Sequence, residues 1–381
     1  MATPIVGIDA QHWAKLETTY DTVSAFASGD AVPLLEISIE PSKEFHKSME
    51  HTGSASLETE IAGIKGGTWS CSAYAKPAAA GTAPDINPFL TAGLGTETIS
   101  GGTSATYSLS NSAQSLQIGR YAGAGLYEVI NGCWVESVEI EITGNDEPKF
   151  TFSGGFASYG FVYDGATIAS GSGTTITVNT AHVGKIQKNA LIKIGSEDNG
   201  GSGYTVTAVD NTAETLTITP TLAGSVSASD VIEPVVPGFT LTASTILGGV
   251  NAGLTLGGTS VGMISTKYTI STGIHGLNKE ATAETSTRLA RGAREVTGEL
   301  NFYYLSENAA QLGQAWDGTT RAVNLRIGED TAAKRCKVNA PAARLEVSGL
   351  EIPEAEEATF TAAFVCRKSA VSNDELTIVF D

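Results

Sequence analysis

Apolar and polar residues alternate along many short stretches of this chain, which is typical of β-strands that bury one face. The clearest stretches are 33–40, 69–74, 105–109, 115–120, 263–270, 296–302 and 321–326. Glycine and polar turn residues separate them, and the chain carries 43 glycines with abundant Thr, Ser, Val and Ile. The pattern therefore predicts a mainly β protein built from short strands and frequent turns.

Helical signals are few. Residues 85–94 predict a short helix with Asp85 or Asn87 as its cap and Pro88 in its first turn. A second short helix is expected over 306–316, capped by Ser306. Residues 12–21 fit either a short helix or an extended arm.

One strand–turn–strand pattern occurs twice, 210 residues apart. Residues 133–152 form the first copy and 344–361 the second, and the offset aligns Ile142 with Ile352 and Phe150 with Phe360. The preceding elements repeat in the same order: strand, polar excursion, strand, helix, strand. A duplicated β unit indicates a module that normally sits beside copies of itself, which favours assembly over catalysis.

Between the copies lie five further strand candidates with Gly-rich turns, which predict a compact β-barrel or sandwich. We therefore expect two tandem β-sandwich domains, each with one short flanking helix, and an inserted small β domain. The expected boundaries are 1–162, 163–235 and 236–381.

The formal net charge is −18 with only 23 Lys and Arg residues. This balance argues against a grip on nucleic acid, which needs clustered cations, but is compatible with a surface past which DNA slides. The four cysteines are far apart in strand-like runs, as expected of buried free thiols in a reducing cytoplasm. The first residues lack the features of a signal peptide, and no run approaches the roughly 18 apolar residues of a membrane helix.

Enzyme signatures are missing. There is no phosphate-binding loop and no His-Glu-x-x-His motif, and the five histidines are dispersed. We expect no enzymatic activity, no catalytic or metal-ligating residues and no cofactor.

The first and last thirds resemble the major tail tube proteins of long-tailed bacteriophages (the siphophage type). The supporting stretches are 17–21, 33–38, 43–50, 66–74, 288–300 and 360–364. The resemblance implies small β-sandwiches, each with one flanking helix, that assemble into stacked rings in the virion tail. It also implies assembly in the host cytoplasm, passage of genomic DNA without specific binding, no membrane contact, and tape measure, tail terminator and distal tail proteins as partners. This chain departs from the commonest pattern by carrying two such units and an insertion, which is expected to project outward.

Geometry suggests the ring size. If each unit supplies about four strands, as the resemblance implies, six units give about 24 strands and a bore of roughly 40 Å, ample for duplex DNA. Three units would leave only roughly 16 Å. The sequence thus predicts a trimeric ring with pseudo-sixfold symmetry.

Alternating glutamates are candidates for a repulsive lumen lining: Glu58, Glu60, Glu139, Glu141, Glu295 and Glu299. The alternative is that they solvate an outer face. The polar excursions 41–53 and 273–292 are candidates for contacts between rings, through Lys43, Phe45, His46, Lys47, His275, Lys279, Arg288 and Arg291. The alternative there is an ordinary exposed loop.

Three rival functions are compatible with parts of this pattern. One of them, a carbohydrate-active or carbohydrate-binding protein, would need clustered exposed aromatics, whereas the four tryptophans are scattered singly. A distal or connecting tail ring protein is the nearest alternative. A secreted β-rich adhesin or surface-layer protein belongs to a different class and should carry an export signal.

Overall fold

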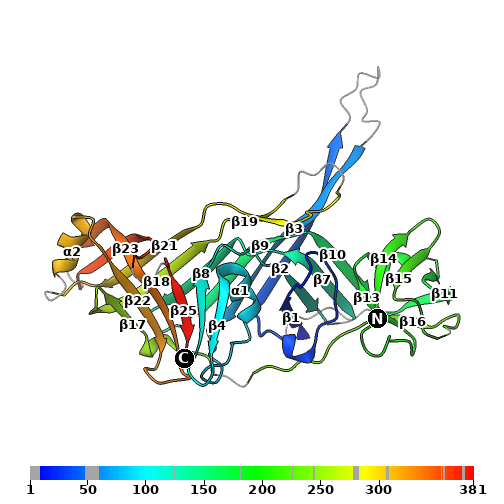
Figure 1. Cartoon of the computed structure of the whole chain (residues 1–381), viewed down its shortest axis with the longest axis horizontal. Coiled ribbons are helices and arrows are strands. Elements are labelled where there is room, and N and C mark those ends of the chain that lie inside the picture. Colours follow the sequence, from blue (N-terminus) through cyan, green and yellow to red (C-terminus); the bar gives the residue numbers. More distant parts are fainter. Residues whose placement is uncertain are drawn as a thin grey trace, which may run out of the picture.

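The computed structural model describes residues 9–47, 60–123, 125–180, 182–224, 226–242, 245–277, 283–305, 309–352, 354, 357–370 and 374–381. The molecule is elongated (Figure 1), and the prediction of a mainly β protein is confirmed. The described residues contain two α-helices, α1 (Asn87–Leu94) and α2 (Ala309–Trp316). Short 3-10 turns lie at η2 (Ser28–Asp30), η3 (Val183–Lys185) and η4 (Gly249–Asn251).

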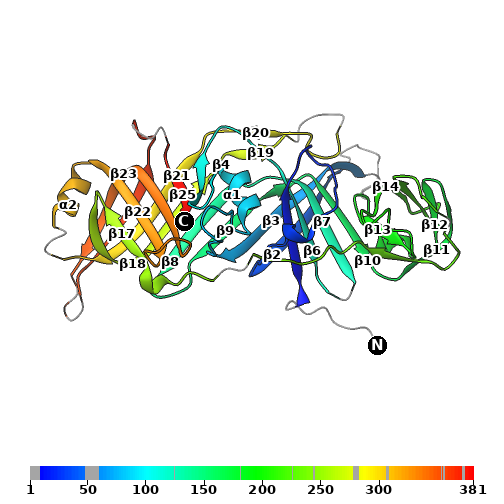
Figure 2. The ribbon, with the colours of Figure 1, turned by 60° about the horizontal axis from the view of Figure 1, so that its bottom comes forward.

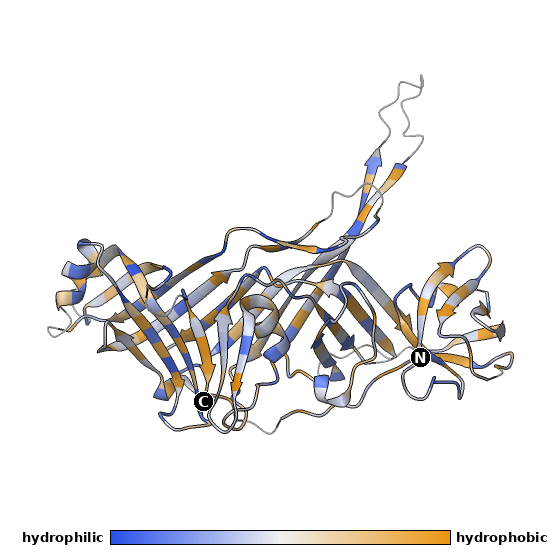
Figure 3. Cartoon of the chain, viewed as in Figure 1, coloured by the Kyte–Doolittle hydropathy of each residue, from blue (hydrophilic) through white to orange (hydrophobic). Residues whose placement is uncertain are grey.

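A large antiparallel sheet runs through both halves of the chain (Figures 1 and 2). Eight of its strands form a continuous path, which we call the eight-strand sheet. In spatial order they are β2 (Glu36–Lys47), β3 (Glu60–Tyr74), β9 (Lys149–Phe156), β8 (Ser137–Thr143), β18 (Thr259–Ser271), β21 (Glu295–Tyr303), β24 (Thr359–Cys366) and β23 (Arg335–Glu351). Apolar and polar residues alternate along these strands in Figure 3, as expected for a sheet with one buried face.

The eight-strand sheet consists of two halves with the same strand order. β2, β3, β9 and β8 of the first half correspond to β18, β21, β24 and β23 of the second. Ile140 pairs with Phe150 in the first hairpin and Leu350 with Phe360 in the second, so the pairing keeps the 210-residue offset. The halves join where β8 pairs with β18, from Ser137 opposite Ser271 to Thr143 opposite Ser265.

A glycine marks the same place in each half. A Cβ at Gly67 would overlap the ring of Phe156 and the carbonyl of Glu40. A Cβ at Gly298 would overlap the ring of Phe364 and the carbonyl of Lys267. In both halves an aromatic ring on the neighbouring strand therefore covers the glycine, which fixes Glu40 and Lys267 as corresponding positions.

Further strands cover the buried face of the second half. β17 (Gly253–Leu256) and β22 (Thr320–Gly328) connect β18 to β23 by a second route, so these strands close on themselves. β25 (Thr377–Phe380) pairs with β23 and with β5 (Ser104–Leu109), and β4 (Gly95–Ser100) follows β5. The C-terminal strand thereby ties the two halves together, and its Phe380 ring lies 6.1 Å from the Phe150 ring of β9. One hydrophobic core spans both halves.

A four-stranded sheet covers the first half, in the order β1 (Gln11–Leu16), β6 (Leu116–Tyr121), β7 (Leu126–Cys133) and β10 (Ser158–Tyr163). The stretch that fitted a helix or an arm therefore begins as a strand. α1 has Pro88 in its first turn as predicted, but its N-cap residue is Ile86, without a side-chain cap, so the predicted caps are wrong. Its Phe89 ring stacks on Phe152 at 5.2 Å, which anchors the helix on the eight-strand sheet.

The middle of the chain forms a closed six-stranded barrel. Its strands are, in spatial order, β11 (Ala166–Ser172), β12 (Thr175–Val178), β15 (Thr215–Thr219), β14 (Tyr204–Asp210), β13 (Leu191–Ile194) and β16 (Val231–Pro234). The sequence predicted five of these strands and missed β11, whose Gly-Ser-rich end resembles a loop. The barrel core is continuous with Tyr127, Val129 and Val162 of the four-stranded sheet. The barrel lies at one end of the long axis, to the right in Figure 1.

Candidate functional site

One face of the eight-strand sheet packs on the core and the other is polar. On β8, Val138, Ile140 and Ile142 are buried, whereas Glu139 and Glu141 point to the opposite face. The remaining strands continue this polar face, largely with Ser, Thr and charged residues. Its carboxylates among the side chains that the structure describes are Glu36, Glu40, Glu139, Glu141, Glu295, Glu299 and Glu346. Its cations are Lys149, Lys267 and Arg344, together with Arg335 and Lys337 at the far end of β23, where both pair with Asp381. The face is therefore net acidic.

Lys267 lies at the centre of this acidic face, on the strand that joins the halves. It is opposite Glu141 on β8 and Glu299 on β21. Its Nζ lies 2.9 Å from Glu139 Oε2. The hydrogen bond to Glu139, with the added charge of Glu141 and Glu299, raises the pKa of Lys267. This ion pair straps β8 to β18 across the junction while leaving an excess of negative charge around it.

Four of the six predicted lumen glutamates come together here. Glu139, Glu141, Glu295 and Glu299 share the polar face. Glu60 lies elsewhere, where β3 pairs with Lys47 far from the junction, and Glu58 lies outside the described residues. Sequence reasoning missed Glu36 and Glu40, although they alternate with Ile37 and Ile39 in the manner of Glu139 and Glu141.

The described part of the first polar excursion, residues 41–47, belongs to a long paired strand rather than to a loop. β2 and β3 stay paired out to Lys47 and Glu60, and they rise away from the body as an arm (Figure 1). The arm carries apolar side chains in water, with Phe45 54% and Ile61 63% exposed. Lys43 Nζ lies 4.7 Å from the centre of the Phe45 ring, and His46 is exposed on the same strand. Exposed apolar residues on a projecting hairpin indicate a contact surface.

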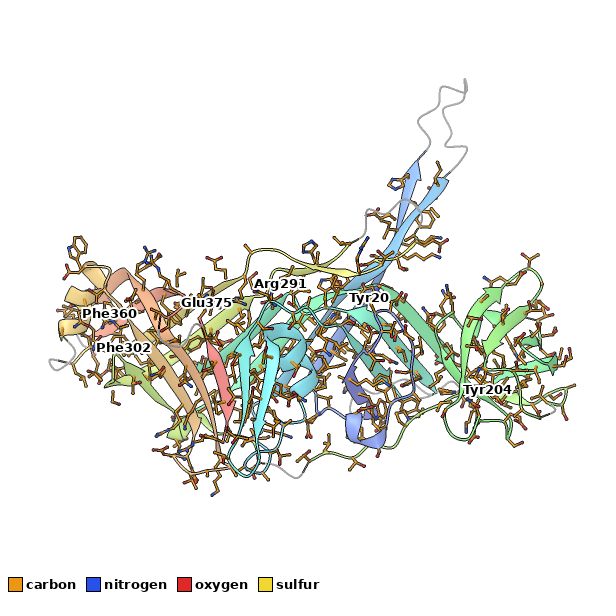
Figure 4. All side chains as sticks on the ribbon, in the orientation of Figure 1. Tyr20, Tyr204, Arg291, Phe302, Phe360 and Glu375 are labelled. Carbon is orange, nitrogen blue, oxygen red and sulfur yellow. The ribbon has the colours of Figure 1, made fainter. Side chains whose placement is uncertain are left out.

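The second polar excursion lies along the first half of the molecule. It contains the short pair β19 (Ile274–Gly276) and β20 (Leu289–Arg291). Arg291 donates from Nη1 to the carbonyl of Ser112 at 2.8 Å, and burial lowers its pKa. Tyr20 Oη donates to Ser286 Oγ at 3.0 Å, and Figure 4 shows Tyr20 and Arg291 along this band.

The remaining residues of this excursion are spread along the band. His275 is exposed, and the Arg288 carbonyl accepts a hydrogen bond from the Leu277 N–H. Lys279 lies outside the described residues. Lys65 at the base of the arm pairs with Glu284 at 2.5 Å, so the band also buttresses the arm. The seven predicted contact residues that the structure describes thus belong to two different structures, a projecting arm and a band held against the body.

The eight-strand sheet has two unlike free edges. Among the residues that the structure describes, β2 pairs only with β3, and the end of β23 beyond Arg344 pairs only with β24. Residues 210 positions apart can be compared between an edge that has a neighbouring strand (a filled edge) and an edge that has none (an open edge). Ile142, next to β18, is 1% exposed, whereas its counterpart Ile352 is 75% exposed. The open edge of the second half therefore lacks the neighbour that the first half has.

No protein-family model and no curated protein matches this chain. In the part of the chain that the structure describes, neither helix has the length and apolar character needed to cross a bilayer.

Proposed function

We propose that this chain is a structural subunit that closes side by side with its own copies into a hollow ring, and that the rings stack into the tail tube of a long-tailed bacteriophage. The β8–β18 junction is the observation that carries the proposal. It joins two four-stranded halves of the same order edge to edge, and it leaves β2 free at one end and β23 free at the other. Repeating the same junction between chains extends the sheet head to tail, and such heterologous contacts generate rings when the rotation closes.

Ring size follows from the strand count. Three chains supply about 24 strands, which at ~4.8 Å spacing and ~45° tilt form a backbone cylinder roughly 50 Å across. Side chains occupy about 10 Å of this, leaving roughly 40 Å for a duplex about 20 Å wide. A trimer of these two-unit chains therefore suffices, with pseudo-sixfold symmetry.

The polar face is assigned to the lumen. Its excess of carboxylates repels the phosphate backbone, so DNA passes without the counterion release that would make it bind. Ser and Thr side chains between the charges provide a hydrated wall. The acidic face and the ring are thus both suited to the passage of a polyanion.

Within this proposal the chain comprises two tail-tube-like β-sandwich domains, 1–162 and 236–381, with the barrel domain, 163–235, inserted between them and projecting outward. The arm of β2 and β3 reaches the neighbouring ring, where Phe45 and Ile61 become buried. The tape measure, terminator and distal tail proteins are the partners at the lumen and the two tube ends, as the resemblance implies.

Electron microscopy of the purified protein tests the proposal. We expect hollow rods built from rings of three chains. Protein that stays monomeric at high concentration, or rings of six or twelve chains, would overturn the assembly or its stoichiometry respectively.

The arm has a separate test. The double variant Phe45→Ser and Ile61→Ser should still form rings but not stack them. The matched control is Ile99→Ser, which changes a similarly exposed apolar residue on β4 and should leave rod length unchanged. Normal rods from the double variant would remove the arm from the stacking contact.

A further inference from the structure

The β8–β18 junction shows how a filled edge is hydrogen-bonded at its end. Beyond the last residue pair, the Gly144 N–H donates to the carbonyl of Ile264 at 2.7 Å. Ile264 lies three residues before Lys267, and a serine follows it. Its carbonyl is thus satisfied by the backbone of the strand that fills the edge.

On the open edge, Ile37 corresponds to Ile264 when residues are counted back from Glu40 and Lys267, with the difference that β18 bulges at Ile264 whereas β2 is regularly paired at Ile37. Glu40 corresponds to Lys267 because each carbonyl lies against the ring-covered glycine of its half. Ile37 lies three residues before Glu40 and is likewise followed by a serine. Its carbonyl therefore stands where an incoming strand would donate, at the position of the Gly144 N–H.

The carbonyl of Ile37 faces away from β3. Pro41 has no N–H, so it fits the ladder opposite Gly67 only if its nitrogen faces the free edge. Backbone polar groups alternate in direction along a strand, and Ile37 lies four residues earlier, so its carbonyl faces the same way. In the free chain this acceptor has a donor from another element. Arg120 on β6 donates from Nη1 to it at 3.2 Å.

Contacts with Glu128 fix the position of the Arg120 guanidinium. Its Nε and Nη2 lie 2.7 and 2.5 Å from Glu128 Oε2 on the adjacent strand. Glu128 is buried, and Tyr159 Oη donates to its other oxygen at 2.7 Å. A forked guanidinium bonds the carboxylate through two nitrogens and leaves Nη1 for the edge, an arrangement that the single nitrogen of lysine does not reproduce.

We propose that Arg120 occupies, in the free subunit, the hydrogen-bonding position that a strand of a second copy of this chain takes on assembly. In the free subunit it satisfies the Ile37 carbonyl and shields the open edge. On assembly the backbone N–H of Glu354, the counterpart of Gly144 at the 210-residue offset, replaces Arg120 as the donor to the Ile37 carbonyl. Arg120 then keeps its ion pair with Glu128. The inference rests on the proposed ring function. It adds that the hydrogen bond from Arg120 to Ile37 competes with the incoming strand and so slows its addition.

Two variants test it. Arg120→Lys keeps the charge beside Glu128 but loses the forked donor. The double variant Arg120→Met with Glu128→Gln removes the donor without stranding a buried carboxylate, and Arg294→Lys, which changes a similarly buried arginine paired with Glu375, is the control that leaves the contact between Arg120 and Ile37 intact. The first two variants should assemble about three- to tenfold faster in light-scattering traces, because one competing hydrogen bond is removed, and the control should match the wild type.

A peptide of residues 345–356 provides a readout that needs no ring. It should bind monomeric Arg120→Lys and the double variant about three- to tenfold more tightly than it binds the wild type or the control. Folded variants with unchanged peptide affinity and unchanged assembly rate would refute this role of Arg120. Peptide binding that is equally absent from all four proteins, together with no rings from the wild type, would instead refute the proposed function.

Discussion

Substitutions at Ile142 and Ile352 measure how much a neighbouring strand contributes to the free energy of unfolding. The two residues correspond across the 210-residue offset, but only Ile142 has a neighbouring strand on the far side of its hairpin. Replacing each by alanine removes the same atoms from two environments. The comparison therefore isolates what the neighbouring strand contributes.

The expected magnitudes follow from burial. Ile142 is almost fully buried in the core that spans both halves, so Ile142→Ala should lower the free energy of unfolding by about 3 kcal/mol, from lost transfer energy plus the cavity. Ile352 is mostly in water, so Ile352→Ala should change it by less than about 0.5 kcal/mol in the free chain.

Denaturant unfolding of dilute, unassembled protein measures both values, with unchanged dependence on denaturant concentration showing that the unfolded surface is the same. In assembled protein the order should change. Ile352→Ala should then lower the denaturant concentration at which rings dissociate, because in the proposed ring the next chain would bury this side chain. Equal destabilisation of the free chain by both variants would refute the reasoning, since it would mean that Ile352 already has its neighbour.

Three further predictions concern the folded chain itself. Gly298→Ala should destabilise it by about 2 kcal/mol because the new methyl group overlaps the Phe364 ring, whereas Gly313→Ala, in open space on α2, should be neutral or stabilising by up to about 1 kcal/mol in the same denaturation assay. Burial, with a smaller effect of the Arg120 charge, lowers the pKa of His12 to about 4, below its unfolded value near 6.5. The unfolded chain then binds the extra proton, so stability should fall by up to about 3 kcal/mol as pH drops from about 6.5 to 4, and His12→Gln should flatten this part of the pH profile. All four cysteine thiols are buried, which raises their pKa values, so a thiol reagent should label none in folded protein and all four after unfolding.

Local periodicity was enough to predict the strands that bury one face. Val138, Ile140 and Ile142 alternate with polar residues because β8 has a core on one side and water on the other. The same rule found β21 and β22 in the second half. Pro88 likewise marked the first turn of α1, since proline is tolerated only where the helix lacks an acceptor for its N–H.

The arm was misread because its signal differs. Beyond Pro41 the hairpin leaves the core, so neither face of it is buried and the apolar alternation stops. Its strand structure comes from backbone pairing with β3 and from Phe45 beside Lys43, none of which local hydropathy records. A paired ribbon without a core has the sequence of a polar loop.

The β8–β18 junction lay beyond sequence reasoning for another reason. Its partners are more than 120 residues apart, and alternation fixes which face of each strand is buried but not which strand lies beside it. Lys267 beside Glu139 and Glu141 is the one complementary pattern that hints at the pairing. Many other lysines would satisfy that pattern equally well.

Fusing two units into one chain changes what the remaining edges must do. In the proposed pseudo-sixfold ring, half of the junctions are made within the chain during folding, so the ring closes through only three contacts between chains, and the entropy cost of bringing the units together is correspondingly smaller. The same fusion leaves each chain with a preformed sheet whose β2 edge resembles a ready template for unwanted pairing. Pro41 removes one donor from that edge, outward-pointing Glu36 and Glu40 place negative charge along it, and Arg120 occupies the acceptor at its end. We expect these three features to disfavour unwanted pairing while leaving the edge open to the one strand whose backbone matches it.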